Sequence, residues 1–179
     1  MKLSLPITAV YTLLGGALLQ ASQVTGTPTT PRLSYLGTAN ITIAPPIPVG
    51  PGPFGNRNIF AVTGGRFDGP RITATVPAVG GDWSLGDPTA GNFYADVRYQ
   101  MHTADGADIL VEANGPQQPE GVVNIRVRFE TGHPAYSWLN SVVSVGIVSR
   151  GPDAAYVIID LWQMEAPATE GKGKGQRRL

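Results

Sequence analysis

Residues 92–103, NFYADVRYQMHT, alternate strictly between polar and apolar side chains. Successive side chains of a β-strand point to opposite faces, so Asp96, Arg98 and His102 would share one face. A carboxylate and an imidazole can transfer protons, and a guanidinium can hold an oxyanion. This face therefore predicts acid–base chemistry if it lines a pocket, and a solvated strand if it meets water.

Two further segments repeat the alternation. One contributes Arg126, Arg128 and Glu130, and the other contributes Tyr156, Asp160 and Trp162. A first interpretation buries the apolar rows and leaves the polar rows in water, where Asp96 and Arg98 only form ion pairs. A second interpretation lines a pocket with the polar rows. The aromatic residues among them, such as Tyr94 and Trp162, favour the second, because they suit a pocket wall better than an outer face.

The pocket interpretation gives roles to a defined set of residues. The candidates for proton transfer and oxyanion binding are Asp96, Arg98, Glu130 and His102, and those for substrate contact are Asp82, Trp83, Tyr94, Arg126, Tyr136, Trp138, Asn140 and Trp162. Asp82 follows two glycines, so it either caps a tight turn or offers a catalytic carboxylate beside Trp83. Tyr136, Trp138 and Asn140 form either a lid over one barrel end or a satellite core cluster.

Other chemistries lack the residues they need. The chain has no cysteine and two histidines, His102 and His133, which excludes thiolate sites and leaves little basis for a histidine metal centre. No glycine-rich loop ends in Lys followed by Ser or Thr, and no G-x-S-x-G elbow occurs. We expect no metal and no cofactor. His102 is then either a base tuned by a carboxylate or a structural histidine.

Apolar residues along the chain follow a period of two rather than about 3.6. The pattern predicts about eight strands, at 36–43, 58–65, 71–78, 93–102, 107–113, 122–130, 141–149 and 155–164. Turn sequences separate them, at 45–56, 67–70, 79–83, 104–107, 114–121 and 150–153. Short connections favour antiparallel neighbours, so we predict an all-β fold, a single antiparallel β-barrel, with one short helical turn at 133–140.

The two ends of the chain differ from the middle. Lys2, an apolar stretch up to residue 19 and small residues around Ala21 are typical of a secretory signal peptide, and Pro6 weakens the alternative of a spanning helix. The predicted organisation is a signal peptide (1–21), a linker (22–32), a barrel domain (33–164) and a disordered basic tail (165–179). The protein would then enter the secretory pathway or be secreted, and Asn40 in Asn-Ile-Thr would be a candidate for glycosylation.

Composition limits the partners. Thirteen basic and thirteen acidic residues cancel, so no net field would draw the protein onto nucleic acid or an anionic membrane. Once the signal is removed, no stable membrane insertion is expected. The remaining candidates are a small hydrophobic molecule and, if an apolar row faces outward, a second copy of the chain.

Four stretches together resemble a known family. They are GGRFDGPRITATVPAVGGDW (64–83), ADVRYQMHTADGADILVEANG (95–115), FETGHPAYSWLN (129–140) and VIIDLWQM (157–164). In order and spacing they are similar to the domain of unknown function 3237, also called UPF0311, and the similarity runs from Pro31 to Met164. The segments 84–92 and 124–128 depart from the family pattern, which puts substrate contacts from them in doubt.

The resemblance implies a compact β-barrel whose role is mostly unassigned, with some fungal members encoded among enzymes of natural-product pathways. Family positions carry over onto Gly64, Gly65, Gly69, Pro70, Asp82, Trp83, the strand 96–99, Thr103, Asp105, Gly106, Glu130, Thr131, Tyr136, Trp138, Leu139 and Asn140.

Three functions follow as expectations. The first is a cofactor-free enzyme that catalyses a cyclisation, an isomerisation or a similar acid–base step on a hydrophobic natural-product intermediate. The second is a carrier that binds such a molecule without changing it. The third is a structural barrel that acts through contacts between copies.

Overall fold

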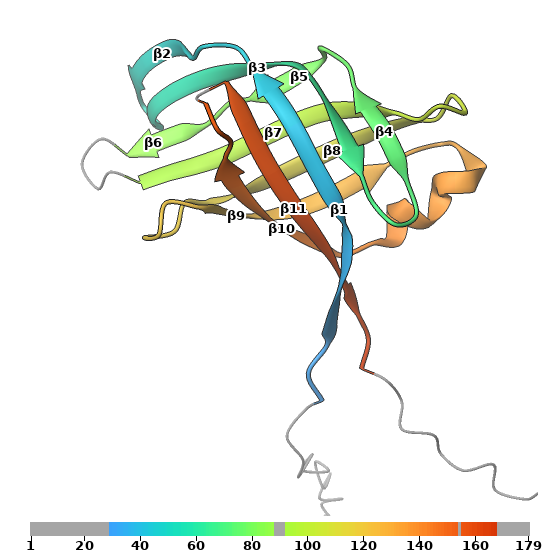
Figure 1. The fold of residues 1–179 in the computed structure, drawn as a ribbon. Helices are drawn as coiled ribbons and strands as arrows, with labels where there is room; N and C mark the ends of the chain where they lie inside the picture. The colour runs from blue at the N-terminus through green and yellow to red at the C-terminus, as the bar shows by residue number, and fades with distance from the viewer. Residues whose placement is uncertain (1–28, 88–91, 154, 168–179) are drawn as a thin grey trace, which may run out of the picture.

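A computed structural model describes residues 29–87, 92–153 and 155–167 (Figure 1). The elements are β1 (Arg32–Ile43), β2 (Ile47–Gly52), β3 (Gly55–Asp68), β4 (Thr73–Val76), β5 (Gly80–Asp82), β6 (Leu85–Asp87), β7 (Asn92–His102), β8 (Asp108–Pro116), β9 (Val123–Glu130), the 3₁₀ helix η1 (Pro134–Ser141), β10 (Ser144–Arg150) and β11 (Tyr156–Glu165). The predicted signal peptide, most of the linker and most of the tail lie outside the described residues.

Antiparallel pairing closes the strands into a barrel. The order β1-β11-β10-β9-β8-β7-β4-β3 returns to its start because β3 also pairs with β1. The short strands β4, β5 and β6 each pair with both β3 and β7, so together they fill one position in the wall. The wall therefore has eight positions, and the predicted antiparallel barrel of about eight strands is confirmed.

Three strands lie where turns or a loop were expected. β2 falls in the proline-rich segment 45–56, and among the described residues it pairs only with β3, outside the closed path. Proline is tolerated at such an edge because its missing N–H faces away from the ladder. β5 and β6 have three residues each, too few to show a period in the sequence. The short helical turn predicted at 133–140 is confirmed by η1.

The alternation of β7 and β9 separates the inside of the barrel from the outside. Every second residue of β9, beginning with Val123, is buried, and the residues between them are exposed. On β7 the buried residues include Ala95, Tyr99 and Met101, while Arg98 and His102 are exposed. The interpretation that lined a pocket with the polar rows is therefore wrong for these two strands, because their apolar rows fill the interior.

One end of the barrel is packed. η1 covers this end and places Leu139 in the core, where the largest buried side chains are Phe67, Met101, Ile109 and Leu161. At the chain ends, the start of β1 and the end of β11 continue beyond the barrel as a paired ribbon, with Arg32 opposite Glu165 (Figure 1).

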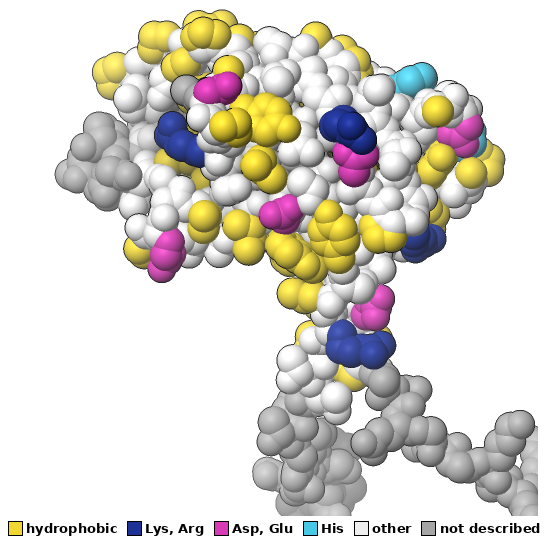
Figure 2. All heavy atoms as spheres, in the orientation of Figure 1, with side chains coloured by type: hydrophobic (Ala, Val, Ile, Leu, Met, Phe, Trp, Pro, Cys, Tyr) yellow, Lys and Arg dark blue, Asp and Glu magenta, His cyan; other side chains and the backbone are white. Residues whose placement is uncertain are grey.

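The outer wall carries no concentrated charge on the side drawn in Figure 2. Its charged side chains stand singly or in pairs among hydrophobic and uncharged ones. Among the described residues, no helix has the length and apolar character needed to cross a bilayer.

Candidate functional site

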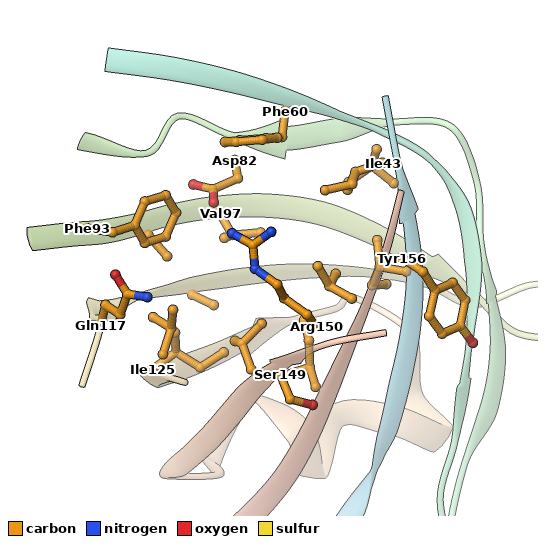
Figure 3. Close-up of a pocket in the computed structure, with 18 of the residues that line it drawn as sticks. Ile43, Phe60, Asp82, Phe93, Val97, Gln117, Ile125, Ser149, Arg150 and Tyr156 are labelled. Atoms are coloured by element: carbon orange, nitrogen blue, oxygen red, sulfur yellow. The ribbon is translucent and has the colours of Figure 1, made fainter. Parts of the chain in front are cut away.

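The end of the barrel opposite η1 contains a cavity of about 220 Å³ (Figure 3). Its wall is almost entirely aliphatic or aromatic. The apolar lining residues are Ile41, Ile43, Phe60, Val62, Phe93, Ala95, Val97, Ala113, Val123, Ile125, Val148, Val157 and Ile159. They are drawn from β1, β3, β7, β8, β9, β10 and β11, so the cavity lies inside the barrel.

Small side chains explain why this half of the barrel is hollow. On β7 the inward row has Ala95 at the cavity but Tyr99 and Met101 toward η1. On β8 the same change occurs, from Ala113 at the cavity to Ile109, which is fully buried. A barrel of eight strands is wide enough for packed side chains or for one small ligand, and this one has room for both.

Asp82 projects a carboxyl group into this apolar space. It lies at the end of β5, opposite Phe60 of β3 and Val97 of β7, and both of those residues line the cavity. Residues directly opposite in an antiparallel pair have side chains on the same face, so Asp82 points inward with them. Figure 3 shows its carboxylate directed into the cavity.

Two glycines allow the backbone of β5 to lie close to both β3 and β7. Gly80 has a φ of +102°, and a Cβ on it would lie 2.1 Å from the backbone oxygen of Arg98. A Cβ on Gly81 would lie 2.8 Å from the backbone oxygen of Phe60. Only glycine fits both positions without displacing the wall, so the Gly-Gly pair is what places Asp82.

The environment of Asp82 favours its neutral form. Burial raises the pKa of its carboxyl group from 3.8 to about 6, and the negative charge of Asp96 adds to the rise. One hydrogen bond acts the other way: the backbone N–H of Asp96 donates to Oδ1 of Asp82 at 2.9 Å. A carboxyl group with a pKa near neutrality can both give and take a proton at physiological pH.

Arg150 is the basic residue of the cavity lining. It ends β10 in phase with the buried Ser144 and Gly146, and its side chain extends into the cavity toward Asp82 (Figure 3). Within the described residues no ion pair joins Arg150 to any carboxylate. The amide of Gln117 adds a further polar group, and its Nε2 donates to the backbone oxygen of Gly121 at 3.2 Å.

The four residues predicted to be catalytic lie on the outer wall, away from this cavity. Arg98 pairs with Asp96 and with Glu112, both at 3.2 Å, and Glu112 also pairs with Arg128. The side chains of Asp96 and Arg98 are 41% and 51% exposed, which places them in water. The hydrogen bond from Arg128 holds the pKa of Glu112 below its ordinary value.

His102 and Glu130 are also exposed. Nδ1 of His102 lies 2.7 Å from Asp108, and this contact lowers the pKa of Asp108. Glu130 and Arg98 border a groove of about 420 Å³ on the outer wall, which Asp96 and His102 do not line. The structure therefore does not bring the four residues together around one ligand.

The residues predicted to contact substrate are also divided. Of these, Asp82 lines the cavity. Tyr94 is 39% exposed and donates to Asn114 on the outer wall, and Arg126 is exposed. Trp162 packs edge-on against Tyr35, with ring centroids 6.4 Å apart. Aromatic residues in an outward row thus have partners on the outer wall and do not indicate a pocket.

Trp83 is half-buried beside Asp82, and its backbone oxygen accepts a hydrogen bond from Arg57. The η1 residues lie at the packed end. The Tyr136 hydroxyl donates to Asp105, and Trp138 lies beneath Arg71, with the guanidinium carbon 3.5 Å from the ring centroid.

Asn140 is held by a pair of hydrogen bonds with the backbone of Thr131. The η1 residues therefore cover the packed end of the barrel, where Leu139 belongs to the main core, and they do not line the cavity. The sequon residue Asn40 is half-buried within β1.

Arg150 and Gln117 were missed in the sequence. Arg150 continues the inward phase of Val148, but it begins the sequence RGPD, which reads as a turn. No group of three or more histidine and acidic residues that could hold a metal occurs in the part of the chain that the structure describes.

The chain matches the family described as a protein of unknown function, DUF3237, over residues 31–125 and 116–164. It belongs to the DUF3237 family. The resemblance predicted from its sequence motifs is thereby confirmed. A DUF3237 relative, the hydroalkoxylation enzyme of Penicillium herquei, is 30% identical over 138 residues, which cover 77% of this chain and 87% of the relative.

Bacterial DUF3237 relatives are similar as well. A UPF0311 protein of Rhodopseudomonas palustris is 32% identical over 127 residues, covering 62% of this chain and 81% of that protein. Among solved structures, a β-barrel-like protein of Acinetobacter baumannii superposes with a TM-score of 0.71 at 29% identity, covering 78% of this chain and 99% of that one. An enzyme of Penicillium herquei superposes with a TM-score of 0.65 at 29% identity, over 78% and 98% of the two chains.

Proposed function

We propose that the protein is an enzyme that adds a hydroxyl group across a carbon–carbon double bond within one hydrophobic substrate and so closes an oxygen-containing ring. The observation that carries this proposal is the Asp82 carboxyl group, which faces an apolar cavity and has its pKa raised to about 6. The hydroalkoxylation enzyme of Penicillium herquei, a relative across most of the chain, supports the same reaction class.

The reaction balances with one carboxyl group. Asp82, in its neutral form, gives its proton to one alkene carbon while the substrate hydroxyl oxygen bonds to the other. The hydroxyl then loses its proton to the Asp82 carboxylate, which restores the starting form. One C–H and one C–O bond form, while one O–H bond and one π bond break. Because nothing is oxidised or reduced overall, the reaction requires no electron donor or acceptor.

The cavity contributes by shape as well as by acidity. Its aliphatic wall keeps water from the positive charge that develops on the alkene carbon during protonation, so the tethered hydroxyl is the nearest nucleophile. Holding the hydroxyl and the alkene together converts the addition into a well-oriented intramolecular step, for which enzymes can gain several kcal/mol, on the order of 7 or more in ideal cases.

Turnover by Asp82→Asn tests the proposal. Asparagine keeps the shape of the side chain and cannot supply the acidic proton. With ortho-allylphenol and longer hydroxyalkenes as probes, we expect ring closure by the unaltered protein and a loss of about 10²–10⁴-fold in the variant. The matched control is Asp108→Asn, which changes an exposed carboxylate that does not line the cavity and should keep full activity.

Two results would contradict the proposal. One is equal turnover by Asp82→Asn and the unaltered protein. The other is tight binding of the probes with no ring closure by the unaltered protein over a broad panel, which would make the barrel a carrier.

A further inference from the structure

We propose that the substrate is an acidic aromatic molecule of one or two fused rings, whose anionic oxygen is held at the cavity mouth by Arg150. The anion could be a phenolate, an enolate or a carboxylate. The inference rests on the proposed function in placing the substrate in this cavity, and it adds the chemical class of the ligand and the residue that selects it.

The size and wall of the cavity set the hydrophobic part of the ligand. A dry apolar cavity of about 150 Å³ binds benzene in another protein. The cavity of about 220 Å³ found here is larger by roughly half, so it suits one ring or two fused rings. Its inward wall includes Phe60 and Phe93, which offer ring surfaces for stacking. A longer substituent would have to leave through the mouth.

The positive charge of Arg150 determines the polar part of the ligand. Arg98 and Arg128 on the outer wall are engaged by carboxylates, but within the described residues Arg150 has no ion-pair partner. Its guanidinium extends into the cavity toward Asp82 (Figure 3), while the residue as a whole is exposed. A guanidinium presents a planar set of donors that matches two oxygens of an anion, so an unpaired arginine over an apolar cavity recognises an amphipathic acid.

The opposite side of the cavity is compatible with an anion. Asp82 is the acidic residue of the lining, and burial favours its neutral form. Below about pH 6, where Asp82 is mostly protonated, an anionic ligand that pairs with Arg150 therefore meets little repulsion from Asp82. A cationic ligand would face the guanidinium without a fixed carboxylate to offset it. The same arrangement orients the ligand, with its acidic oxygen at the mouth and its apolar body against Asp82.

Calorimetric titration with three probes tests this assignment: naphthoate, its neutral counterpart naphthamide and a naphthyl trimethylammonium cation. For the unaltered protein we expect naphthoate to bind at least about tenfold more tightly than naphthamide, as one charge-assisted hydrogen-bonded pair allows. The cation should bind most weakly. Arg150→Gln should remove the preference for naphthoate and keep the affinity for naphthamide, which also shows that the cavity is intact. Arg126→Gln, an exposed arginine outside the cavity, is the matched control and should change nothing.

Several results would overturn the inference. They are equal binding of naphthoate and naphthamide by the unaltered protein, tighter binding of the cation, or an Arg150→Gln variant that keeps the naphthoate preference. The outcome is separable from that of the proposed function. If naphthoate binding depends on Arg150 but no hydroxyalkene is converted, the ligand class stands and the reaction does not. If ring closure occurs with no preference for anionic probes, the reaction stands and the ligand class does not.

Discussion

Asp82 and Asp96 lie on opposite sides of the same wall. The backbone N–H of Asp96 donates to the Asp82 carboxylate at 2.9 Å, yet one side chain enters the barrel and the other meets water. Asp96 pairs with Arg98, within a cluster that Glu112 and Arg128 complete. Asp82 has no ion pair among the described residues, and its pKa is raised to about 6.

The comparison shows that residue type and spacing in the sequence do not decide whether an acidic side chain is suited to proton transfer. A carboxylate that faces water beside arginines stays ionised, since both the solvent and its partners stabilise the charge. A carboxylate that an apolar wall deprives of water keeps its proton until a higher pH. The inner acid is therefore suited to proton transfer, while the outer acids belong to the surface of the barrel.

The largest expected loss of stability comes from replacing Gly80, which allows β5 to lie between β3 and β7. Gly80→Ala places a Cβ 2.1 Å from the backbone oxygen of Arg98 at a φ of +102°. We expect the free energy of unfolding in urea to fall by on the order of 3 kcal/mol or more, with loss of the Asp82 geometry. Gly106→Ala is the matched control, because its φ is +88° but nothing lies within 4 Å. It should cost only about 1 kcal/mol, and equal losses would show that the close approach at Gly80 does not matter.

The second effect is a pH-dependent cost of burying the inner acid. The folded pKa of Asp82, about 6, lies above its ordinary value of 3.8, so the folded state holds the proton more tightly than the unfolded state. Proton binding by Asp82 therefore stabilises the folded state, and this contribution is present below about pH 4 and is lost as the pH rises through 6. Asp82→Asn cannot lose a proton. Its stability relative to the unaltered protein should therefore rise by about 2 kcal/mol between pH 4 and pH 7. Urea unfolding at each pH measures the difference, and Asp96→Asn should show no such rise.

The third effect concerns the empty half of the barrel. Ala113→Leu adds three carbons to the cavity wall, so it should reduce the affinity for naphthoate at least about tenfold without lowering stability, since it fills space instead of creating it. Ala104→Leu makes the same addition at an exposed position outside the cavity and should bind naphthoate normally. Unchanged binding by Ala113→Leu would place the ligand outside the cavity.

The smallest effect should follow changes to the outer cluster. Arg98→Gln breaks two exposed ion pairs, and exposed pairs contribute little because water already solvates both charges. We expect ring closure and naphthoate binding to stay at the level of the unaltered protein, with a small shift in the urea midpoint. Loss of turnover with an unchanged urea midpoint would instead place the active site on the outer wall around Arg98.

The sequence predicted the strands of the barrel wall better than the residues that line the cavity. The period of two located the strands, because one face of each strand is buried. The predicted pocket face is wrong on β7, because Tyr94 of its polar row lies on the outer wall. In the structure Trp162 packs against Tyr35 on the outside, so aromatic residues can pair across an outer wall.

The inner site depends on pairings that a single sequence does not reveal. Asp82 could be named as a candidate because it follows Gly80 and Gly81. Its direction depends on lying opposite Phe60 and Val97, which are far away along the chain. Arg150 was hidden for a related reason, since a basic residue before Gly-Pro looks like part of a turn. Its place in the cavity lining follows from closure of the barrel.

The most direct test of the central claim is a ¹³C NMR titration of the aspartate side-chain carboxyl groups, with the Asp82 signal assigned by its absence in Asp82→Asn. The structure predicts that this signal titrates with a midpoint of about 6. The Asp108 signal should titrate below 3.8, because His102 stabilises its charged form. An Asp82 midpoint at or below 3.8 would contradict the account, because the inner carboxyl group would then be as ionised as those in water.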